Sequence, residues 1–406
     1  MRISTSACLL ASAVAGFIPS WASAGFFEDS KGNLTLRNYY FNDDFRDDAN
    51  DHREWAQGFL LKLQSGFTDG PVGFGLDALG LAAVRLDSSR SHAGTQLLPV
   101  HADGRAAHEY SSLGLTAKLR WRELLVSSGT LLPRMPVLVY NNGRILPQTF
   151  QGTQFEYSGV ERLYIQAGYL DKFKLRNSSD SVAIYPKGYG GGRGSDFQYA
   201  GLRYELNKNL SVSTYQGELK EFYRQQFYGL VHRQPIGPGK LLSDLRYFIS
   251  DDAGAARNGK VDSDMFSGLF TYQWAGHAFG LGYQKVDGST ALPYINGSTV
   301  YSFSNASVGK FIQAGERTWM ARYDYDFAHL GLPGLNVMTR YYKGDGGVYK
   351  GRAAREHEWD SQVKYIVQSG WAKGFGAEFR HAVTGSTYAS GRDNSRLYFT
   401  YDLKLW

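Results

Sequence analysis

The sequence predicts an all-β fold, a transmembrane antiparallel β-barrel of about eighteen strands with one connection folded inward as a constriction loop. The main observation is a period of two in hydrophobicity, repeated in segments of about ten residues along the chain, which is typical of strands with one lipid face and one polar lumen face. In residues 395–406 the apolar positions are Leu397, Phe399, Tyr401, Leu403 and Leu405, and the intervening ones are Arg396, Tyr398, Thr400, Asp402 and Lys404. The segment from Glu316 alternates Trp319, Ala321, Tyr323, Tyr325 and Phe327 with Thr318, Met320, Arg322, Asp324 and Asp326.

Composition supports this fold class. The 406 residues include 28 Tyr, 24 Phe, 8 Trp and 48 Gly but only 11 Pro, and no run of eighteen apolar residues occurs. A helical membrane protein is therefore excluded. Tyr and Trp are favoured at the two boundaries between lipid and water. The alternative is a large soluble β-sandwich or propeller, but a propeller should show a blade-length repeat and the sequence has none.

Residues 1–24 have the features of a secretory signal peptide. Arg2 supplies the positive start, residues 7–18 the apolar stretch, and residues 22–24 an A-x-A cleavage site. We therefore expect the barrel to comprise residues 25–406. The one cysteine, Cys8, lies in the signal, so no disulfide is expected. Removal of Arg2 lowers the formal net charge from +6 to +5. A net positive charge this small does not indicate nucleic-acid binding.

Eighteen segments have strand character, with sixteen as the alternative count. They are residues 31–42, 54–66, 72–86, 109–121, 123–130, 152–159, 162–175, 195–206, 210–220, 223–234, 241–251, 261–274, 277–287, 316–328, 335–343, 356–368, 374–385 and 395–406. The tight connections are 68–71, 207–209, 235–240, 275–276 and 330–334, and the long ones are 43–53, 87–108, 130–151, 176–194, 288–315 and 344–355. Short turns on one rim and long loops on the other are typical of bacterial barrels, and an even count returns both chain ends to the periplasmic side.

The long connection at residues 131–152 is unusually apolar for a loop. It contains three prolines, many Leu, Ile and Val side chains, and few charges. Such a segment is best explained by packing against the inner wall of the barrel, where it would narrow the passage. The alternatives are a loop folded over the outer rim or a subunit contact. Folded inward, it would present its polar residues to a passing solute: Arg134, Tyr140, Asn141, Asn142 and Arg144.

These residues resemble a known family. The string PVLVYNNGRILPQTFQG at 136–152 is similar to the constricting third loop of the OprD-type outer-membrane carboxylate channels of pseudomonads. Further matching strings are GFFEDSKGNLTLRNYYFN (25–42), WAQGF (55–59), ELKEFYRQQFYGLVH (218–232), GHAFGLGYQ (276–284), RYDYDFAHLGLPGLNVMTRYYKGD (322–345) and SRLYFTYDLKLW (395–406). The resemblance implies a monomeric eighteen-stranded porin, with weak trimerisation as the alternative, in contact with outer-membrane lipid and lipopolysaccharide. It also implies that the third and seventh loops form a narrow eyelet, beside which a ladder of basic residues guides carboxylates.

Alternation places several basic side chains on the lumen face, where they are candidates for this ladder. Guanidinium groups suit the task because they stay charged and bind carboxylates through two parallel hydrogen bonds. Spaced along a narrow lumen, they would pass an anion on without trapping it. The alternative is that they pair with lumen carboxylates, such as Asp324, Asp326, Glu356, Glu358 and Asp360, and brace the wall. The candidates are Arg37, Lys118, Arg120, Arg246, Arg322, Arg340, Arg380 and Arg396.

The sequence departs from the resemblance at two places. Asn141 and Asn142 stand where the family commonly has an acid, and the outward parity falls on Leu405 instead of the terminal Trp406. The missing acid and the compact loops favour aromatic or cyclic monocarboxylates as solutes, with basic amino acids and small peptides as the alternative.

An outer-membrane enzyme is the other class of function considered. Motifs such as H-E-x-x-H and G-x-S-x-G are absent, and alternation puts His357 on the opposite face from Glu356 and Glu358. We expect no catalytic residue, metal or cofactor. An iron-chelate transporter would need a plug domain before the first strand, and strand character begins about seven residues after the cleavage site.

Overall fold

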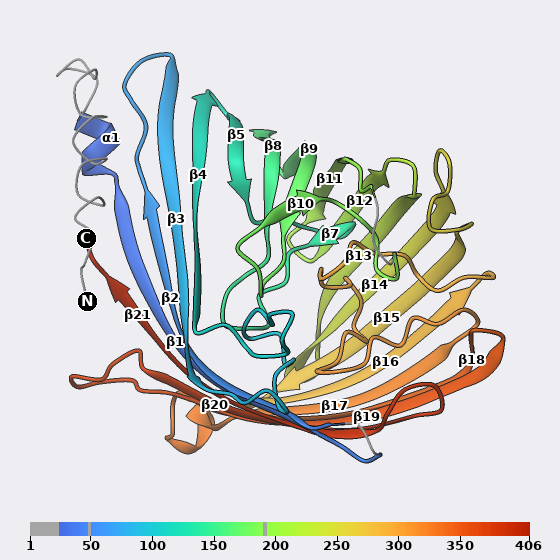
Figure 1. Cartoon of the computed structure of the whole chain (residues 1–406). Helices are drawn as coiled ribbons and strands as arrows, with labels where there is room; N and C mark the ends of the chain where they lie inside the picture. The colour runs from blue at the N-terminus through green and yellow to red at the C-terminus, as the bar shows by residue number, and fades with distance from the viewer. Residues whose placement is uncertain (1–23, 48–49, 190–192) are drawn as a thin grey trace.

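The computed structural model describes residues 24–47, 50–189 and 193–406 and shows a closed antiparallel β-barrel (Figure 1). The expected signal peptide, residues 1–24, lies outside the described residues except for Ala24, where the short helix α1 (Ala24–Glu28) begins. Among the described residues, no helix is both long and apolar enough to cross a membrane. The fold class predicted from the alternation is confirmed.

The barrel wall contains every strand segment that the sequence predicted. The sheet has nineteen strands, of which β10 (Ser181–Ala183) pairs with β9 alone, so eighteen described strands form the wall. They are β1 (Lys31–Phe45), β2 (His52–Gln64), β3 (Val72–Asp87), β4 (Glu109–Trp121), β5 (Leu124–Leu131), β8 (Thr149–Val160), β9 (Leu163–Lys174), β11 (Phe197–Asn207), β12 (Leu210–Leu219), β13 (Tyr223–Ile236), β14 (Gly239–Asp252), β15 (Asp262–Trp274), β16 (His277–Asp287), β17 (Arg317–Asp326), β18 (Leu335–Tyr349), β19 (Arg352–Ile366), β20 (Gly376–Ser386) and β21 (Arg392–Lys404).

The barrel closes where the first strand meets the last. β1 pairs with β2 on one side and β21 on the other, so Arg37 lies opposite both Gly58 and Thr400. In Figure 1 the red β21 accordingly runs beside the blue β1. The strand ends at Lys404, and Trp406 leaves the alternation, its Nε1 donating to Oγ of Ser30 over 3.0 Å. Closure leaves no free edge in the wall.

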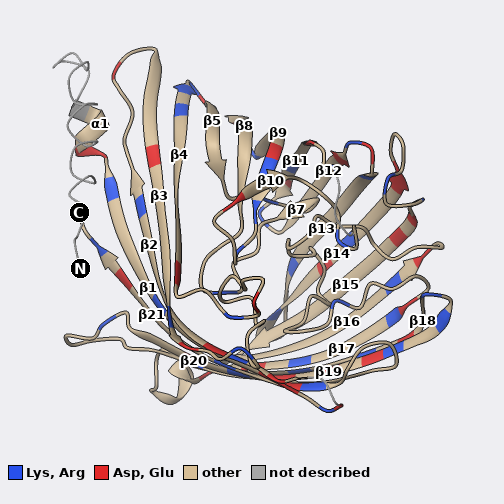
Figure 2. Cartoon of the chain, viewed as in Figure 1, with Lys and Arg blue, Asp and Glu red and all other residues tan. Residues whose placement is uncertain are grey.

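The two faces of the wall differ as the period of two predicts. On the outer face, large apolar side chains are exposed, including Leu281 (68%) and Trp319 (62%), as expected for a surface in contact with lipid. On the inner face, Met320 is 3% exposed beside Trp319, and Tyr39 and Phe41 are buried. Figure 2 shows Lys and Arg interspersed with Asp and Glu along β17, β18 and β19. The strand register places Arg322, Arg340 and Asp360 on the inner face, with Met320.

The connections at one rim are tight. Between β15 and β16, Ala275 and Gly276 have φ angles of 47° and 83°, which is the type I′ geometry that matches the twist of a two-residue hairpin. The β17–β18 connection is longer and contains the 3-10 helix η1 (Phe327–Leu330), whose N-terminus is capped by the side chain of Asp326. Asp326 therefore serves the turn instead of pairing with a lumen arginine.

One expected long loop, at residues 344–355, is wrong. β18 and β19 continue through this segment and are joined by a two-residue turn, Lys350 and Gly351, with φ angles of 48° and 75°. The glycines that gave the segment its loop-like composition instead serve a register shift in the ladder, between Gly344 and Gly347. Glycine inside a strand often marks such a bulge.

A charge on the lipid face should destabilise the barrel. Leu281 lies in the middle of β16, between Phe270 and Ala321 of the neighbouring strands. We expect Leu281→Arg to lower the free energy of unfolding by about 2–4 kcal/mol, the cost of a cation near the bilayer midplane. Urea titration in liposomes measures this, with Leu281→Phe as the apolar control. Equal stability of the two variants would contradict the assignment of this face to lipid.

Candidate functional site

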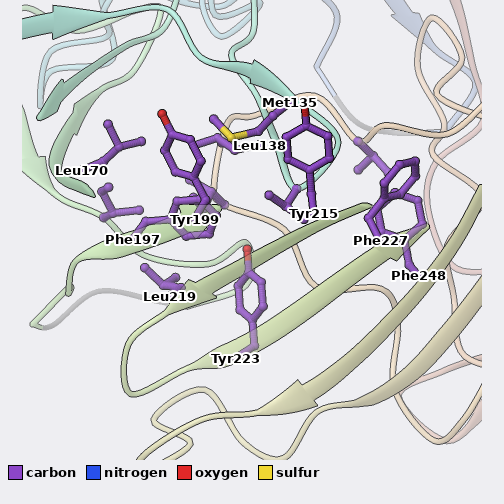
Figure 3. Packing of buried hydrophobic residues seen from close by; sticks show 14 of the residues in the cluster. Met135, Leu138, Leu170, Phe197, Tyr199, Tyr215, Leu219, Tyr223, Phe227 and Phe248 are labelled. Atoms are coloured by element: carbon purple, nitrogen blue, oxygen red, sulfur yellow. The ribbon is translucent and has the colours of Figure 1, made fainter. Parts of the chain in front are cut away.

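The connection between β5 and β8, residues 132–148, folds into the barrel as the sequence predicted; we call it the constriction loop. Its first half forms a small hairpin of two strands that pair with each other, β6 (Arg134–Met135) and β7 (Leu138–Val139). Met135 and Leu138 are buried in one cluster with Phe197, Tyr199 and Tyr215 of the wall (Figure 3). Apolar burial on β11 and β12 therefore holds this half of the loop.

The second half of the constriction loop is buried on the opposite part of the wall. Ile145 and Leu146 are completely buried in a cluster that includes Tyr39 and Phe41 of β1. Gly58 of β2 permits this close approach, because a Cβ atom there would lie only 2.8 Å from Cγ1 of Ile145. The loop thus spans the lumen between two apolar contacts, and the alternative positions, over the outer rim or at a subunit contact, are excluded.

Polar contacts fix the tip of the constriction loop on three sides. Asn141 donates from Nδ2 to the carbonyl oxygen of Gly297 (2.9 Å), and Asn142 accepts from Nη1 of Arg37 (2.9 Å). Arg144 donates from Nε to the carbonyl oxygen of Thr95 (2.8 Å). The predicted tip residues are therefore brought together, but their side chains also hold the loop in place.

The two other predicted loop residues contact each other. Arg134 donates from Nη2 to Oη of Tyr140 (2.9 Å), and its guanidinium carbon lies 5.0 Å from the centroid of the same ring. Neither residue lines the larger cavity described below, whereas Asn141 and Arg144 do. Arg134 and Tyr140 thus support the loop from one side of the passage.

The connection between β16 and β17, residues 288–316, also folds inward and meets the constriction loop. Thr299 donates its backbone N–H to the carbonyl oxygen of Val139 (2.9 Å), and Gln148 donates from Nε2 to the carbonyl oxygen of Asn296 (3.0 Å). Together with the bond from Asn141 to Gly297, these contacts join the two loops across the lumen. The two loops that the resemblance implicated in the eyelet therefore meet inside the barrel.

Two buried carboxylates of β19 anchor the β16–β17 loop to the wall. Glu358 accepts hydrogen bonds from the backbone N–H groups of Val308 (2.8 Å) and Gly309 (2.6 Å), and Asp360 accepts a longer one from Ser307 (3.3 Å). Such buried charges need full sets of donors to be tolerated. Glu358 therefore serves loop docking, while Asp360 also contacts an arginine of the wall.

Two cavities follow one side of the lumen. The larger, about 1550 Å³, lies among the inward loops and the wall strands β17 to β21, and the smaller, about 690 Å³, opens between the short turns at the other rim. Arg322, Met338 and Gln362 line both cavities. The cavities therefore adjoin at β17, β18 and β19, which outlines a passage along this wall.

Four of the predicted ladder arginines lie on this wall, in register across neighbouring strands. Arg322 is the Cα partner of Arg340, and Arg380 is the Cα partner of Arg396. All four line the larger cavity. Sequence alternation therefore identified a row of arginines that the fold brings side by side.

Three of these four arginines contact a carboxylate. Arg322 forms two hydrogen bonds with Asp324 (2.6 and 2.7 Å), and Arg380 forms one with Glu378 (2.7 Å). Arg340 pairs with the buried Asp360 at 2.7 Å. Arg396 instead donates to neutral oxygens, the side chain of Asn394 (2.5 Å) and the carbonyl of Ser307 (2.6 Å). Three of the four arginines are therefore paired with a carboxylate, and Arg396 is held by neutral groups.

The other four predicted ladder residues do not line either cavity. Arg37 holds the constriction loop at Asn142, and Arg246 is paired in bidentate fashion with Asp244 (2.9 and 2.6 Å). Lys118 contacts Asp77 at 2.6 Å, and Arg120 lies with its guanidinium carbon 4.2 Å from the ring centroid of Phe67, near the β2–β3 turn. The fold therefore distributes the eight basic residues around the lumen instead of along one line.

Several basic loop residues, and Arg392 at the start of β21, were missed by the sequence reasoning. Arg176 and Lys187 of the β9–β11 loop, Lys310 of the β16–β17 loop and Arg392 of β21 all line the larger cavity. Burial lowers the pKa of Lys310 to about 8, and nearby cations act in the same direction. Burial and the neighbouring Arg144 also lower the pKa of Arg176, to about 9, so both groups are charged at neutral pH. Loops lack a periodic pattern, and only their basic composition could have drawn attention to these positions.

Among the described residues, no three His, Cys, Asp or Glu side chains are arranged to hold a metal ion. The larger cavity is lined by residues of the constriction loop, the β9–β11 loop, the β16–β17 loop and the wall.

Comparison with known proteins gives a family match over nearly the whole chain. The family described as "outer membrane porin, OprD family" matches residues 24–405. The porin-like protein GalP of Pseudomonas putida is 35% identical over 403 residues, which cover 97% of each chain. The crystal structure of Pseudomonas aeruginosa OccK9 (OpdG) superposes on this chain with a TM-score of 0.92 and is 40% identical in sequence. The crystal structure of Pseudomonas aeruginosa OpdK with vanillate superposes with a TM-score of 0.90 and is 41% identical. Each match covers 94% of this chain and all of the other chain.

Filling the space at Gly58 should disturb the constriction loop. In Gly58→Ala, the new methyl group would overlap Ile145, and we expect a loss of about 1–3 kcal/mol of stability from overpacking together with noisier channel current. Gly80→Ala is the matched control, because the nearest atom to its Cβ is an ordinary 3.5 Å away. Single-channel recording and urea unfolding test both variants. Identical behaviour of the two would mean that Ile145 is not packed as described.

Proposed function

Because the chain belongs to the OprD family of outer membrane porins, we propose that it is a substrate-selective channel for the passive uptake of small carboxylate-containing solutes. The observation that carries the proposal is the row of arginines on the wall of the larger cavity, beside the loop that narrows the lumen. The relatives are porins, which are channel proteins, and the enzyme alternative is set aside on that ground.

The chemistry of the arginine row suits a carboxylate. A guanidinium presents several N–H donors in one plane and can release one partner while it binds another. Arg322 and Arg340 are near neighbours, as are Arg380 and Arg396, so an anion can exchange hydrogen bonds from one donor to the next. We propose that these four arginines form the translocation ladder and that Arg37, Lys118, Arg120 and Arg246 contribute to the field of the lumen.

The bracing alternative rests on a specific observation. Arg322, Arg340 and Arg380 each contact a carboxylate, which offsets part of their charge. In the ladder proposal the carboxylates hold the guanidinium groups in place and keep an anion from binding too tightly, as conduction requires. In the bracing proposal they are the arginines' sole partners. The two proposals differ in what happens when both members of a pair are removed.

We further propose that aromatic and cyclic monocarboxylates are preferred over basic amino acids and small peptides. The tip of the constriction loop offers the amides of Asn141 and Asn142, so it lacks the carboxylate that would attract a cationic side chain. Glu358, which does line the cavity, already accepts two hydrogen bonds from the β16–β17 loop. A similar porin has been solved with vanillate, an aromatic monocarboxylate.

The outer surface and the closed wall support two further proposals. We propose that the barrel is a monomer, as the resemblance implies; the pairing of β1 with β21 rules out association through a free strand edge. The exposed apolar side chains of the wall, such as Leu281 and Trp319, would contact outer-membrane lipid and lipopolysaccharide.

The ladder and bracing proposals predict opposite results at Arg380. We expect Arg380→Gln to lower benzoate uptake roughly tenfold, the equivalent of about 1.4 kcal/mol for a charge-assisted hydrogen bond. The double variant Arg380→Gln/Glu378→Gln should stay low, because the guanidinium is still missing. Liposome uptake of labelled benzoate measures both. Recovery in the double variant would support bracing, since the net charge and the wall packing are restored.

A carboxylate at the tip of the constriction loop should change selectivity. Asn142→Asp would place a negative charge next to Arg37, where the amide oxygen now accepts a 2.9 Å hydrogen bond. The resulting ion pair should leave the aperture nearly unchanged but weaken the field that favours anions. We expect lower uptake of benzoate and equal or higher uptake of arginine. Reversal potentials in asymmetric salt provide the measurement, with Asn142→Ala as the uncharged control, and no shift relative to Asn142→Ala would contradict the proposal.

A further inference from the structure

Four basic side chains from four different elements converge on the larger cavity. They are Arg144 of the constriction loop, Arg176 of the β9–β11 loop, Lys310 of the β16–β17 loop and Arg396 of β21. Their charges act on one another, because Arg144 and Arg396 both lower the pKa of Arg176, and Arg144 and Arg176 both lower that of Lys310. We call these four residues the cationic ring.

The cationic ring differs from the rest of the wall in its partners. In the described part of the chain, none of its four members forms an ion pair, in contrast to Arg322, Arg340 and Arg380. Neutral oxygens hold them instead: Arg144 donates to the carbonyl of Thr95 (2.8 Å), Arg176 to Oε1 of Gln96 (2.5 Å) and Arg396 to the carbonyl of Ser307 (2.6 Å). Such contacts orient the cations without placing a carboxylate in direct contact with them.

Phe41 of β1 brings two members of the ring together. The guanidinium carbon of Arg144 lies 4.3 Å from the Phe41 ring centroid, and that of Arg396 lies 4.9 Å from it. One comes from the loop and the other from the wall. Contact with an aromatic ring stabilises a cation without supplying a counter-ion. The two guanidinium groups are thus fixed close together at one point of the lumen.

We propose that the cationic ring is a subsite for solutes that carry two anionic groups, dicarboxylates above all. The proposal rests on the proposed function, since it concerns the same passage. Within the acids that the channel accepts, a solute with two carboxylates would reside at the ring longer than its monocarboxylate counterpart. Arg144 and Arg396 are suited to one carboxylate each, with Arg176 and Lys310 supplying further positive charge.

The physical reason is the mutual repulsion of the four cations. A single carboxylate compensates one positive charge and leaves the others to repel each other in a confined, poorly screened space. A second carboxylate on the same solute adds another attraction without a second loss of translational freedom. Three acids face the cavity near the ring, but Asp43 is occupied by Arg392 and Asn394, Glu358 by the β16–β17 loop, and Glu356 by the hydroxyl of Tyr388. They do not substitute for a solute anion.

Benzoate and phthalate provide a matched pair of probes, since they share one aromatic ring and differ by one carboxylate. We expect phthalate to interrupt single-channel current for about tenfold longer than benzoate at pH 7 and low salt, where such charges are least screened. Equal residence times would overturn the proposal. If neither acid interrupts the current or crosses the membrane, the proposed function itself fails, so the two failures are distinguishable.

Variants locate the effect in the ring. Arg176→Gln and Lys310→Gln should each reduce the excess residence of phthalate severalfold while changing that of benzoate little, because Arg144 and Arg396 remain for one carboxylate. Arg176→Lys, which keeps the charge, should restore most of the effect. The control is Arg105→Gln, which removes the same charge from an exposed residue of the β3–β4 loop outside both cavities. Equal loss for the two acids, or the same loss in Arg105→Gln, would overturn the proposal.

A change of pH offers a test without mutation. The groups acting on Lys310 are the cations Arg176, Lys187 and Arg144 and the carboxylate Glu358, and its pKa is lowered to about 8. Lys310 is therefore charged at pH 7 and loses its charge as the pH rises through 8, and Arg176, whose pKa is about 9, begins to lose its charge towards pH 9, while both probes stay ionised. We expect the excess residence of phthalate to fall severalfold between pH 7 and 9. The same fall in Lys310→Gln would show that another group is responsible.

Discussion

Backbone hydrogen bonding is the constraint on which the rest of this molecule depends. Hydrocarbon offers neither donors nor acceptors, so every membrane strand must be paired on both sides and the sheet must close on itself, which β1 and β21 accomplish. A closed wall of this many strands encloses more space than its own side chains fill. The constriction loop and the β16–β17 loop occupy that space, and their backbone groups bond to each other and to Glu358.

The distribution of charge follows from the geometry of a strand. Residues two apart share a face, so Asp244 and Arg246, Asp324 and Arg322, and Glu378 and Arg380 neutralise each other within one strand. Loop residues have no such neighbour at a fixed spacing. In the described part of the chain, Arg144, Arg176 and Lys310 therefore lie where the loops meet without an ion pair. The wall supplies many hydrogen-bond donors whose charge is paired within a strand, and the loops supply cations that form no such pair.

The sequence was informative where local order decides the structure. A period of two is visible in each strand, so the wall, the lipid face at Trp319 and the inward position of Arg322 could all be predicted. The apolar character of the constriction loop could likewise be read from residues such as Leu138 and Ile145. The extended hairpin of β18 and β19 was missed, because glycines that serve a bulge have the composition of a loop.

Contacts between segments that are distant in the chain could not be predicted from the sequence. No pattern in the chain brings Arg176 beside Arg144, or pairs Arg340 of β18 with Asp360 of β19. The same applies to the positions of Lys118 and Arg120, whose parity was right but which lie by the β2–β3 turn, away from both cavities. Alternation predicts which face of the wall a side chain occupies. The position of that side chain along the barrel axis depends on strand tilt and shear.

The seam between β1 and β21 also determines when this protein can finish assembling. Its contacts join residues such as Thr35 and Asp402, which are 367 positions apart, and Asn141 meets Gly297 across 156 positions. Loops of this length close slowly because their entropy must be lost before any contact compensates it. Synthesis delivers β1 first and β21 last, so an open-edged chain has to survive transit through the periplasm. Its rate of assembly is therefore governed by topology, and protection from aggregation is needed until the last strand arrives.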